Sequence, residues 1–161
     1  MVRVRIERPD PPDAIALIDA LDAYQKPLYP AESHHGIDVD ALLQPHVVFA
    51  IARTEAGAAV GCGAFVADEG WAELKRMYVV PAQRGRGVAQ ALLAFLEHEA
   101  QARGVAVMRL ETGNLQPDAL RFYERAGYVR RGPFGDYDDD PHSVFMEKAF
   151  VRKIGGEEAC G

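Results

Sequence analysis

The chain has 161 residues, 48% hydrophobic and 26% charged, which suits one packed domain and excludes a disordered or fibrous chain. Asp and Glu number 24 against 18 Lys and Arg, so the formal net charge is -6 and a nucleic-acid partner is not expected. Cationic small molecules or basic peptides suit this charge better. Apolar stretches are much shorter than a bilayer span and no apolar signal segment opens the chain, so we expect a soluble, cytoplasmic protein without a membrane partner.

The two cysteines do not form a disulfide framework or a paired metal motif. Cys62 lies in an apolar run and Cys160 lies near the end of the chain. We therefore expect two free thiols.

The first half of the chain predicts one helix and a set of strands. Alternating charged and β-branched residues predict a strand over 2–8, which the following prolines end. Apolar residues at three- and four-residue steps predict a helix from Asp13 to Tyr24. A loop over 26–36 and a short helix over 39–43 follow. Turn-forming residues then separate three strand-like runs, expected as an antiparallel meander, at 47–53, 60–67 and 72–80.

The second half alternates helices and strands, which predicts partly parallel pairing. A helix begins after the loop over 84–87 and ends at Gly104. The remaining expected elements are a strand over 105–110, a turn over 112–114, a helix over 117–126, strands over 128–130 and 143–150, and a frayed tail over 153–161. No repeat is visible, and we expect one domain over 1–152.

The segment between Val80 and the following helix has the composition of a phosphate-binding loop. Gly85 and Gly87 allow a ligand to approach the backbone, while Arg84 and Arg86 add positive charge. The amides at the start of the helix add positive potential. A dinucleotide-binding fingerprint would need a third glycine where the chain has Gln90. Taken alone, the pattern also suits an ordinary turn.

Arg84-x-x-Gly87-x-Ala89 resembles the pyrophosphate-binding signature of the GNAT superfamily of N-acetyltransferases. The preceding strand 73–79, the helical Ala91-Leu92-Leu93 and the segment 119–128 occur in the order and spacing of that family. Segments 29–33, 110–113 and 133–146 further resemble a bacterial subgroup of acetyltransferases, which does not fix an acceptor. The resemblance implies an α/β (α+β) fold with a mixed, mostly antiparallel sheet of six or seven strands. Helices would cover both faces, and the sheet would splay at an acetyl-coenzyme A cleft.

The resemblance also implies which residues bind acetyl-coenzyme A. Amides between Arg84 and Ala89 would hold the pyrophosphate, and the backbone from Met77 to Val79 would pair with the pantetheine arm. The Met77 amide would face the thioester carbonyl and stabilise the oxygen that gains charge on attack. The alternative is a plain ladder hydrogen bond. The residues expected at this site are Met77, Tyr78, Val79, Arg84, Gly85, Arg86, Gly87, Val88, Ala89, Asn114 and Tyr123.

A protonated amine must lose a proton before it attacks the thioester. Glu73 is the first candidate for the base, because a glutamate at the matching position serves so in relatives. On an ideal strand Glu73, Lys75 and Met77 share a face, although a bulge would alter this register. A histidine-linked water as the base, and a solvated Glu73 paired with Lys75, remain open.

Tyr123 occupies the position at which many relatives have a tyrosine that protonates the leaving thiolate. A phenol stays protonated at neutral pH and can serve as this acid. The alternative is an aromatic ring that only packs. Many relatives have an asparagine where this chain has Gln116, and Asn114 is the substitute that we consider for its contact.

The sequence does not identify the acceptor. Glu32, His34, His35 and Asp136 are candidate acceptor-binding residues, and the run 138–140 reads as a solvated loop. The histidines, including His142, match no zinc spacing, so we expect no metal. The expected reaction is direct transfer in a ternary complex with Glu73, Met77 and Tyr123. The alternative function is a noncatalytic acyl-coenzyme A sensor, and a homodimer remains open.

Overall fold

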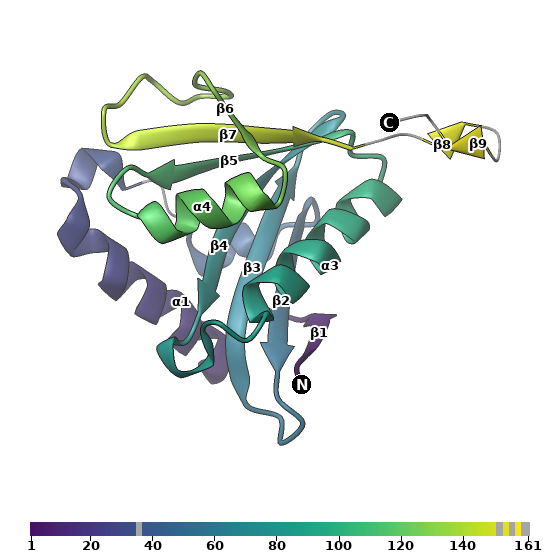
Figure 1. Ribbon diagram of the computed structural model, residues 1–161. Coiled ribbons are helices and arrows are strands. Elements are labelled where there is room, and N and C mark those ends of the chain that lie inside the picture. The colour runs from purple at the N-terminus through teal and green to yellow at the C-terminus, as the bar shows by residue number, and fades with distance from the viewer. Residues whose placement is uncertain (35–36, 151–152, 155–156, 159–161) are drawn as a thin grey trace.

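The computed structural model describes residues 1–34, 37–150, 153–154 and 157–158, the last two pairs as backbone only. His35 and Cys160 therefore lie outside the described residues. Figure 1 shows a central sheet with helices on both faces. The expected mixed, mostly antiparallel α/β fold is confirmed.

Seven strands form this sheet in the order β1-β2-β3-β4-β5-β7-β6. Only β4 and β5 pair in parallel, and the pairs β1–β2, β2–β3, β3–β4, β5–β7 and β6–β7 are antiparallel. The strands are β1 (Arg3–Ile6), β2 (Val47–Arg53), β3 (Ala59–Ala67), β4 (Trp71–Val79), β5 (Val107–Gly113), β6 (Val129–Arg131) and β7 (Ser143–Ala149). The predicted meander is β2 to β4.

Among the described residues, two α-helices lie on each face of the sheet. One face carries α1 (Pro12–Gln25) and the short α2 (Val39–Leu42), and the other carries α3 (Val88–Ala102) and α4 (Pro117–Arg125). Short 3-10 turns at Lys26–Leu28, Ala31–Ser33 and Pro81–Gln83 lie in the connections. None of the helices in the described part of the chain is long and apolar enough to cross a membrane.

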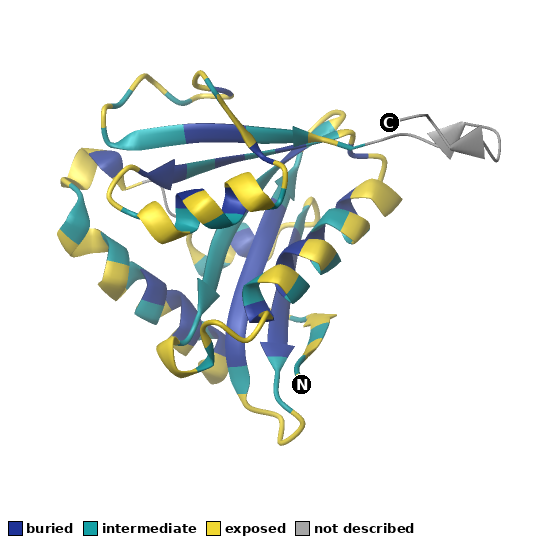
Figure 2. Ribbon diagram, in the orientation of Figure 1, coloured by how far each residue is buried: buried dark blue, intermediate teal, exposed yellow. Residues whose placement is uncertain are grey.

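Two apolar cores lie on the two faces of the sheet. The core under α3 and α4 includes Phe65, Leu92 and Leu96. The core under α1 and α2 includes Leu17 and Phe49. Figure 2 shows the buried residues on the strands and on the inner helix faces, while the outer helix faces are exposed.

Two expectations differ from the structure by more than small shifts at the ends of an element. β5 begins at Val107 and continues to Gly113, through residues expected as a turn, because it pairs with β7 as far as Gly113↔Ser143. In the tail that we expected to be frayed, β8 (Lys153–Ile154) pairs with β9 (Glu157–Glu158). The rest of that tail lies outside the described residues.

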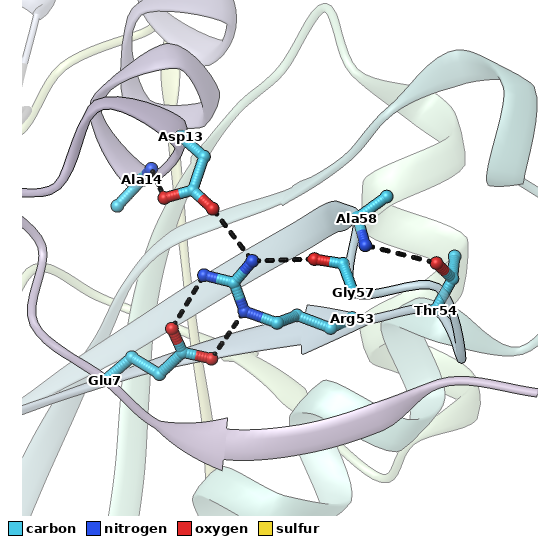
Figure 3. A network of polar contacts seen from close by, with 7 residues as sticks. All are labelled: Glu7, Asp13, Ala14, Arg53, Thr54, Gly57 and Ala58. Atoms are coloured by element: carbon cyan, nitrogen blue, oxygen red, sulfur yellow. Dashed lines mark hydrogen bonds and ion pairs between the residues drawn. The ribbon is translucent and has the colours of Figure 1, made fainter.

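Arg53, the last residue of β2, joins the residue after β1 to the start of α1 (Figure 3). Its guanidinium donates to both oxygens of Glu7 at 2.8 and 2.9 Å, to Asp13 at 2.8 Å and to the Gly57 carbonyl at 2.9 Å. These hydrogen bonds, that to Glu7 first, raise the pKa of Arg53. The hydrogen bond from Arg53 also lowers the pKa of Asp13.

We predict that Arg53→Met lowers the free energy of unfolding by about 1 to 2 kcal/mol, because a forked, partly buried network is lost. Denaturant unfolding at pH 7 measures this loss. Because Asp13 has a lowered pKa when folded, its contribution is present above its unfolded pKa and disappears as the pH falls through its folded pKa. As the pH falls through this range, the free energy of unfolding should therefore decrease less in the variant than in the wild type.

Arg5→Met is the matched control, because Arg5 is exposed on β1 and makes no ion pair with any described residue. Its effect should stay within about 0.5 kcal/mol. Equal losses for the two variants would contradict a specific contribution from the Arg53 network.

Candidate active site

β4 contains a bulge at Arg76. Arg76 has φ of 59°, the only positive φ of a non-glycine residue among those described. Cys62 pairs with Tyr78 and Ala64 pairs with Lys75, so two residues of β4 lie opposite Gly63. An additional residue on one strand reverses the alternation of side chains beyond it.

The bulge separates side chains that an ideal strand would place together. Leu74 and Met77 both pack with the core under α3. Glu73 and Lys75 alternate with Leu74 and so lie on the opposite face. The expectation that Glu73, Lys75 and Met77 share a face is therefore wrong.

A cleft opens where β4 and β5 separate. Their pairing runs from Trp71↔Val107 to Leu74↔Leu110. Beyond this point β4 continues beside β3, while β5 continues beside β7. A cavity of about 360 Å³ lies at the divergence, lined by β4, β5, α4, α1 and the segment after α1. We refer to it as the strand cleft.

The strand cleft brings Met77 and Tyr123 together in its lining. Tyr123 is 8% exposed, and its ring packs edge-on against Phe122 and Tyr128. Burial raises the pKa of its phenol. Its hydroxyl has no hydrogen bond within the described part of the chain. Tyr123 is thus a neutral phenol in the wall of the strand cleft whose hydroxyl is not committed to another described residue.

The glycine loop follows the same strand at its carboxyl end. Gly85 and Gly87 have φ of 75° and 80°, which a side chain would disfavour, and α3 begins immediately afterwards at Val88. Ala91 N–H donates to the Gly87 carbonyl, so the amides of the first turn before it have no intrahelical partner. This arrangement suits an anion such as a pyrophosphate.

The remaining residues expected to bind coenzyme A lie outside the strand-cleft lining, namely Tyr78, Val79, Arg84 to Ala89 and Asn114. Arg84 Nε donates to the Val79 carbonyl at 3.0 Å, and its guanidinium lies 5.7 Å from the centre of the Tyr78 ring. Asn114 has an exposed side chain, and its backbone N–H donates to the His142 carbonyl.

Glu73 belongs to a partly buried polar triad with Lys75 and Tyr137, of which the sequence suggested only the pair with Lys75. Its Oε2 accepts from the Tyr137 hydroxyl at 2.5 Å and lies 3.1 Å from Lys75 Nζ. Lys75 Nζ also donates to the Tyr137 hydroxyl at 2.7 Å. Burial, followed by the charge of Glu73, raises the pKa of Tyr137. The Glu73 carboxylate is thus partly buried and is bound by both Lys75 and Tyr137.

A second, larger cavity of about 1080 Å³ adjoins this triad, and we refer to it as the acidic cavity. Its charged lining is almost entirely carboxylate, with Lys75 the one Lys or Arg among its described lining residues. The acidic residues are Glu32, Asp68, Glu73, Asp136, Asp138, Asp139 and Asp140. Ser33, Lys75 and His142 line both the acidic cavity and the strand cleft.

The candidate acceptor residues divide between the two cavities. Glu32 and Asp136 line the acidic cavity, whereas His34 lines the strand cleft. His34 Nε2 donates to the Tyr29 carbonyl at 2.9 Å. His142 lines both cavities and has a buried Nδ1 without a hydrogen-bond partner among the described residues. Among those residues, no group of His, Cys, Asp and Glu could hold a metal ion.

Tyr29 crosses the strand cleft from the segment after α1 to the end of β5. Its hydroxyl donates to Gln116 Oε1 at 3.2 Å and accepts from Leu115 N–H at 3.1 Å. A Cβ atom built on Gly113 would lie 1.8 Å from the Tyr29 hydroxyl. Gln116, which stands where the resemblance predicts an asparagine, is therefore hydrogen-bonded to Tyr29. Glycine at 113 was the only sequence signal of this contact.

We predict that Gly113→Ala lowers both stability and turnover, because the new methyl group must displace the Tyr29 ring. The substitution should cost about 2 kcal/mol with Tyr29 present and much less in a Tyr29→Ala background. A double-mutant cycle by denaturant unfolding measures this coupling. Equal costs in the two backgrounds would show that Tyr29 is not what Gly113 accommodates.

Comparisons with known proteins agree with this geometry. The sequence matches the acetyltransferase (GNAT) family over residues 15–128. An IAA acetyltransferase of Azospirillum brasilense is 45% identical over 152 residues, covering 92% of this chain and 99% of the relative.

Solved structures show the same arrangement of strands and helices. A crystal structure from Klebsiella pneumoniae subsp. pneumoniae, provisionally named an acyl-CoA N-acyltransferase, matches with a TM-score of 0.81 and 41% identity, covering 92% of this chain and 97% of that one. PaiA N-acetyltransferase of Thermoplasma acidophilum, solved with coenzyme A, matches with a TM-score of 0.70 and 17% identity, covering 93% and 99%. The latter likeness concerns the fold.

Proposed function

The chain belongs to the acetyltransferase (GNAT) family, and we propose that it transfers the acetyl group of acetyl-coenzyme A to a primary amine that carries additional positive charge. The observation that carries this proposal is the junction of the two cavities. Ser33, Lys75 and His142 line both of them, so a donor in the strand cleft and an amine in the acidic cavity would meet there.

The glycine loop and the strand cleft fit acetyl-coenzyme A. The loop offers backbone amides and a helix N-terminus for the pyrophosphate, and β4 beyond Leu74 is not paired with β5, which leaves its backbone on that side for the pantetheine arm. The bound donor supplies an activated thioester. In our proposal the Met77 N–H donates to the thioester carbonyl oxygen and stabilises its developing negative charge.

Proton transfer is assigned to residues on the two sides of this junction. Glu73, through its contact with Tyr137 or through water, takes the proton that the ammonium form of the acceptor must lose. The amine nitrogen then bonds to the acetyl carbon, and the carbon–sulfur bond breaks. Tyr123 gives its phenolic proton to the departing thiolate. No acyl-enzyme is needed, and burial raises the pKa of the Cys62 thiol to about 12.

Unpaired carboxylates support a cationic acceptor. The side chains of Glu32, Asp136, Asp138 and Asp139 make no hydrogen bond or ion pair with other described residues, whereas Lys75 is bound to Glu73 and Tyr137. The acidic cavity therefore retains a negative field, which attracts ammonium groups and repels anionic acceptors.

We predict that coenzyme A thiol release will be faster with diamines and triamines than with monoamines of equal length. Replacing Asp136, Asp138 and Asp139 by Asn should raise KM for a triamine roughly tenfold, because three exposed charges each contribute up to about 1 kcal/mol. This effect should shrink as salt concentration rises. Steady-state release of thiol measures the rate with each amine and the KM for the triamine.

The matched control replaces Asp19 and Asp40 by Asn and Glu55 by Gln, which are exposed and line neither cavity. It changes the net charge equally and should leave KM unchanged. If the two triple variants raised KM equally, the effect would come from the net charge of the protein and not from the acidic cavity. The absence of thiol release with every amine, despite acetyl-coenzyme A binding, would contradict an amine acceptor and favour the sensor.

We predict that Tyr123→Phe lowers kcat by about 100-fold without weakening coenzyme A binding, because only the proton donor is removed. Burial raises the pKa of Tyr123, so this group should stay protonated, and cause no loss of turnover, up to about pH 10. Initial rates and calorimetric titration give the two quantities. Tyr128→Phe is the control, since Tyr128 is also buried but donates to Glu97. An unchanged kcat in Tyr123→Phe would remove Tyr123 from the mechanism.

A further inference from the structure

Arg76 adopts a conformation that its residue type disfavours. Its φ of 59° lies in the left-handed region, where a side chain crowds the backbone. Such a residue persists when the surrounding contacts hold it in place. The contacts of Arg76 therefore show which segments of the chain hold the bulge of β4.

The Arg76 guanidinium joins two segments of the chain to β4. Nη1 pairs with Asp22 Oδ1 at 2.5 Å, and Nε and Nη2 donate to the Ile37 carbonyl at 3.0 and 2.8 Å. The side chain is 7% exposed. On the other side of the bulge, Cys62 Sγ donates to the Arg76 carbonyl at 3.2 Å. Both the side chain and the backbone of Arg76 are therefore fixed.

Asp22 and Ile37 lie on either side of the segment that crosses the cavities. Asp22 is in the last turns of α1, and Ile37 precedes α2. Between them the chain contributes Tyr29 and Ser33 to the strand cleft, and Ser33 to the acidic cavity as well. Ser33 also donates to Asp140 at 2.6 Å. One guanidinium thus contacts the chain before and after residues 26–34, which we call the wall segment.

The same residue determines where Met77 lies. Met77 follows Arg76 directly, and the bulge turns its side chain toward the core under α3. The proposed carbonyl donor is the Met77 amide, which is joined to Arg76 by a single peptide bond. Rotation at Arg76 would therefore move this amide relative to the wall segment.

We propose that Arg76 is a positioning residue. It fixes the position of the Met77 amide relative to the wall segment at the junction of the two cavities. This inference rests on the proposed function. Arg76 acts through Met77 and the wall segment and does not take part in proton transfer. A misplacement of about 1 Å at a reacting centre can lower the rate roughly 100-fold, so turnover should respond more strongly than binding.

The test compares Arg76→Lys with the wild type. Lysine keeps the charge beside Asp22 but lacks the planar fork that reaches Asp22 and Ile37 together. We expect kcat to fall roughly tenfold or more, while KM for acetyl-coenzyme A changes by about twofold or less. Arg53→Lys is the matched control, because it removes a forked network whose residues line neither cavity. It should lower stability and leave kcat unchanged.

Hydrogen exchange gives a readout that does not depend on the acceptor. The amides of Ser33 and His34 donate to the carbonyls of Pro30 and Ala31. In Arg76→Lys these amides should exchange faster, while the amides of α3 exchange as in the wild type. Uniformly faster exchange would indicate general destabilisation and would overturn a positioning role.

The two proposals fail in different ways. If the wild type releases thiol and Arg76→Lys retains its kcat and its exchange pattern, the positioning role is wrong and the proposed function stands. If the wild type releases no thiol with any amine but exchange rises at Ser33 and His34, the coupling through Arg76 is present and the proposed function is wrong.

Discussion

The separation of β4 from β5 is the constraint on which the rest of this structure depends. The two strands pair from Trp71↔Val107 to Leu74↔Leu110 and then follow different neighbours. Opening a sheet exposes backbone groups that need other partners. In the proposed function the pantetheine arm provides those partners for β4, while Tyr29 crosses the gap and bonds to the turn after β5. The cleft is therefore part of the sheet itself, formed where β-pairing stops.

The bulge at Arg76 adds a second consequence to this opening. An uninterrupted strand would place Glu73, Lys75 and Met77 on one face, in contact with one compartment. The bulge directs Met77 toward the core under α3 and leaves Glu73 and Lys75 beside Tyr137. The Met77 side chain and the proposed base Glu73 thus lie on different sides of the sheet, while the Met77 N–H, the proposed carbonyl donor, belongs to the strand backbone near the plane of the sheet.

Sequence patterns predicted the elements of the fold better than the contacts between them. Local periodicity was sufficient for α1, α3 and the three strands of the meander, and two glycines before Val88 indicated the loop that begins α3. The bulge was not predictable, because arginine is not a residue type that signals a positive φ. The contact between Glu73 and Tyr137 joins residues 64 positions apart, and a single sequence carries no distance information of that range. The role of Glu73 as base and the acceptor role of Asp136 remain predictions.

Three tyrosines near the two cavities illustrate how hydrogen bonding distinguishes residues of the same type. The Tyr29 hydroxyl is bonded to Gln116 and Leu115, and the Tyr137 hydroxyl is bonded to Glu73 and Lys75. The Tyr123 hydroxyl has no such partner among the described residues and lies in the lining of the strand cleft. A phenol that already donates to a carboxylate would have to break that bond before it protonated a thiolate, whereas Tyr123 has no bond to break. Burial raises the pKa of both Tyr123 and Tyr137, so hydroxyl availability, and not acidity, favours Tyr123 as the acid.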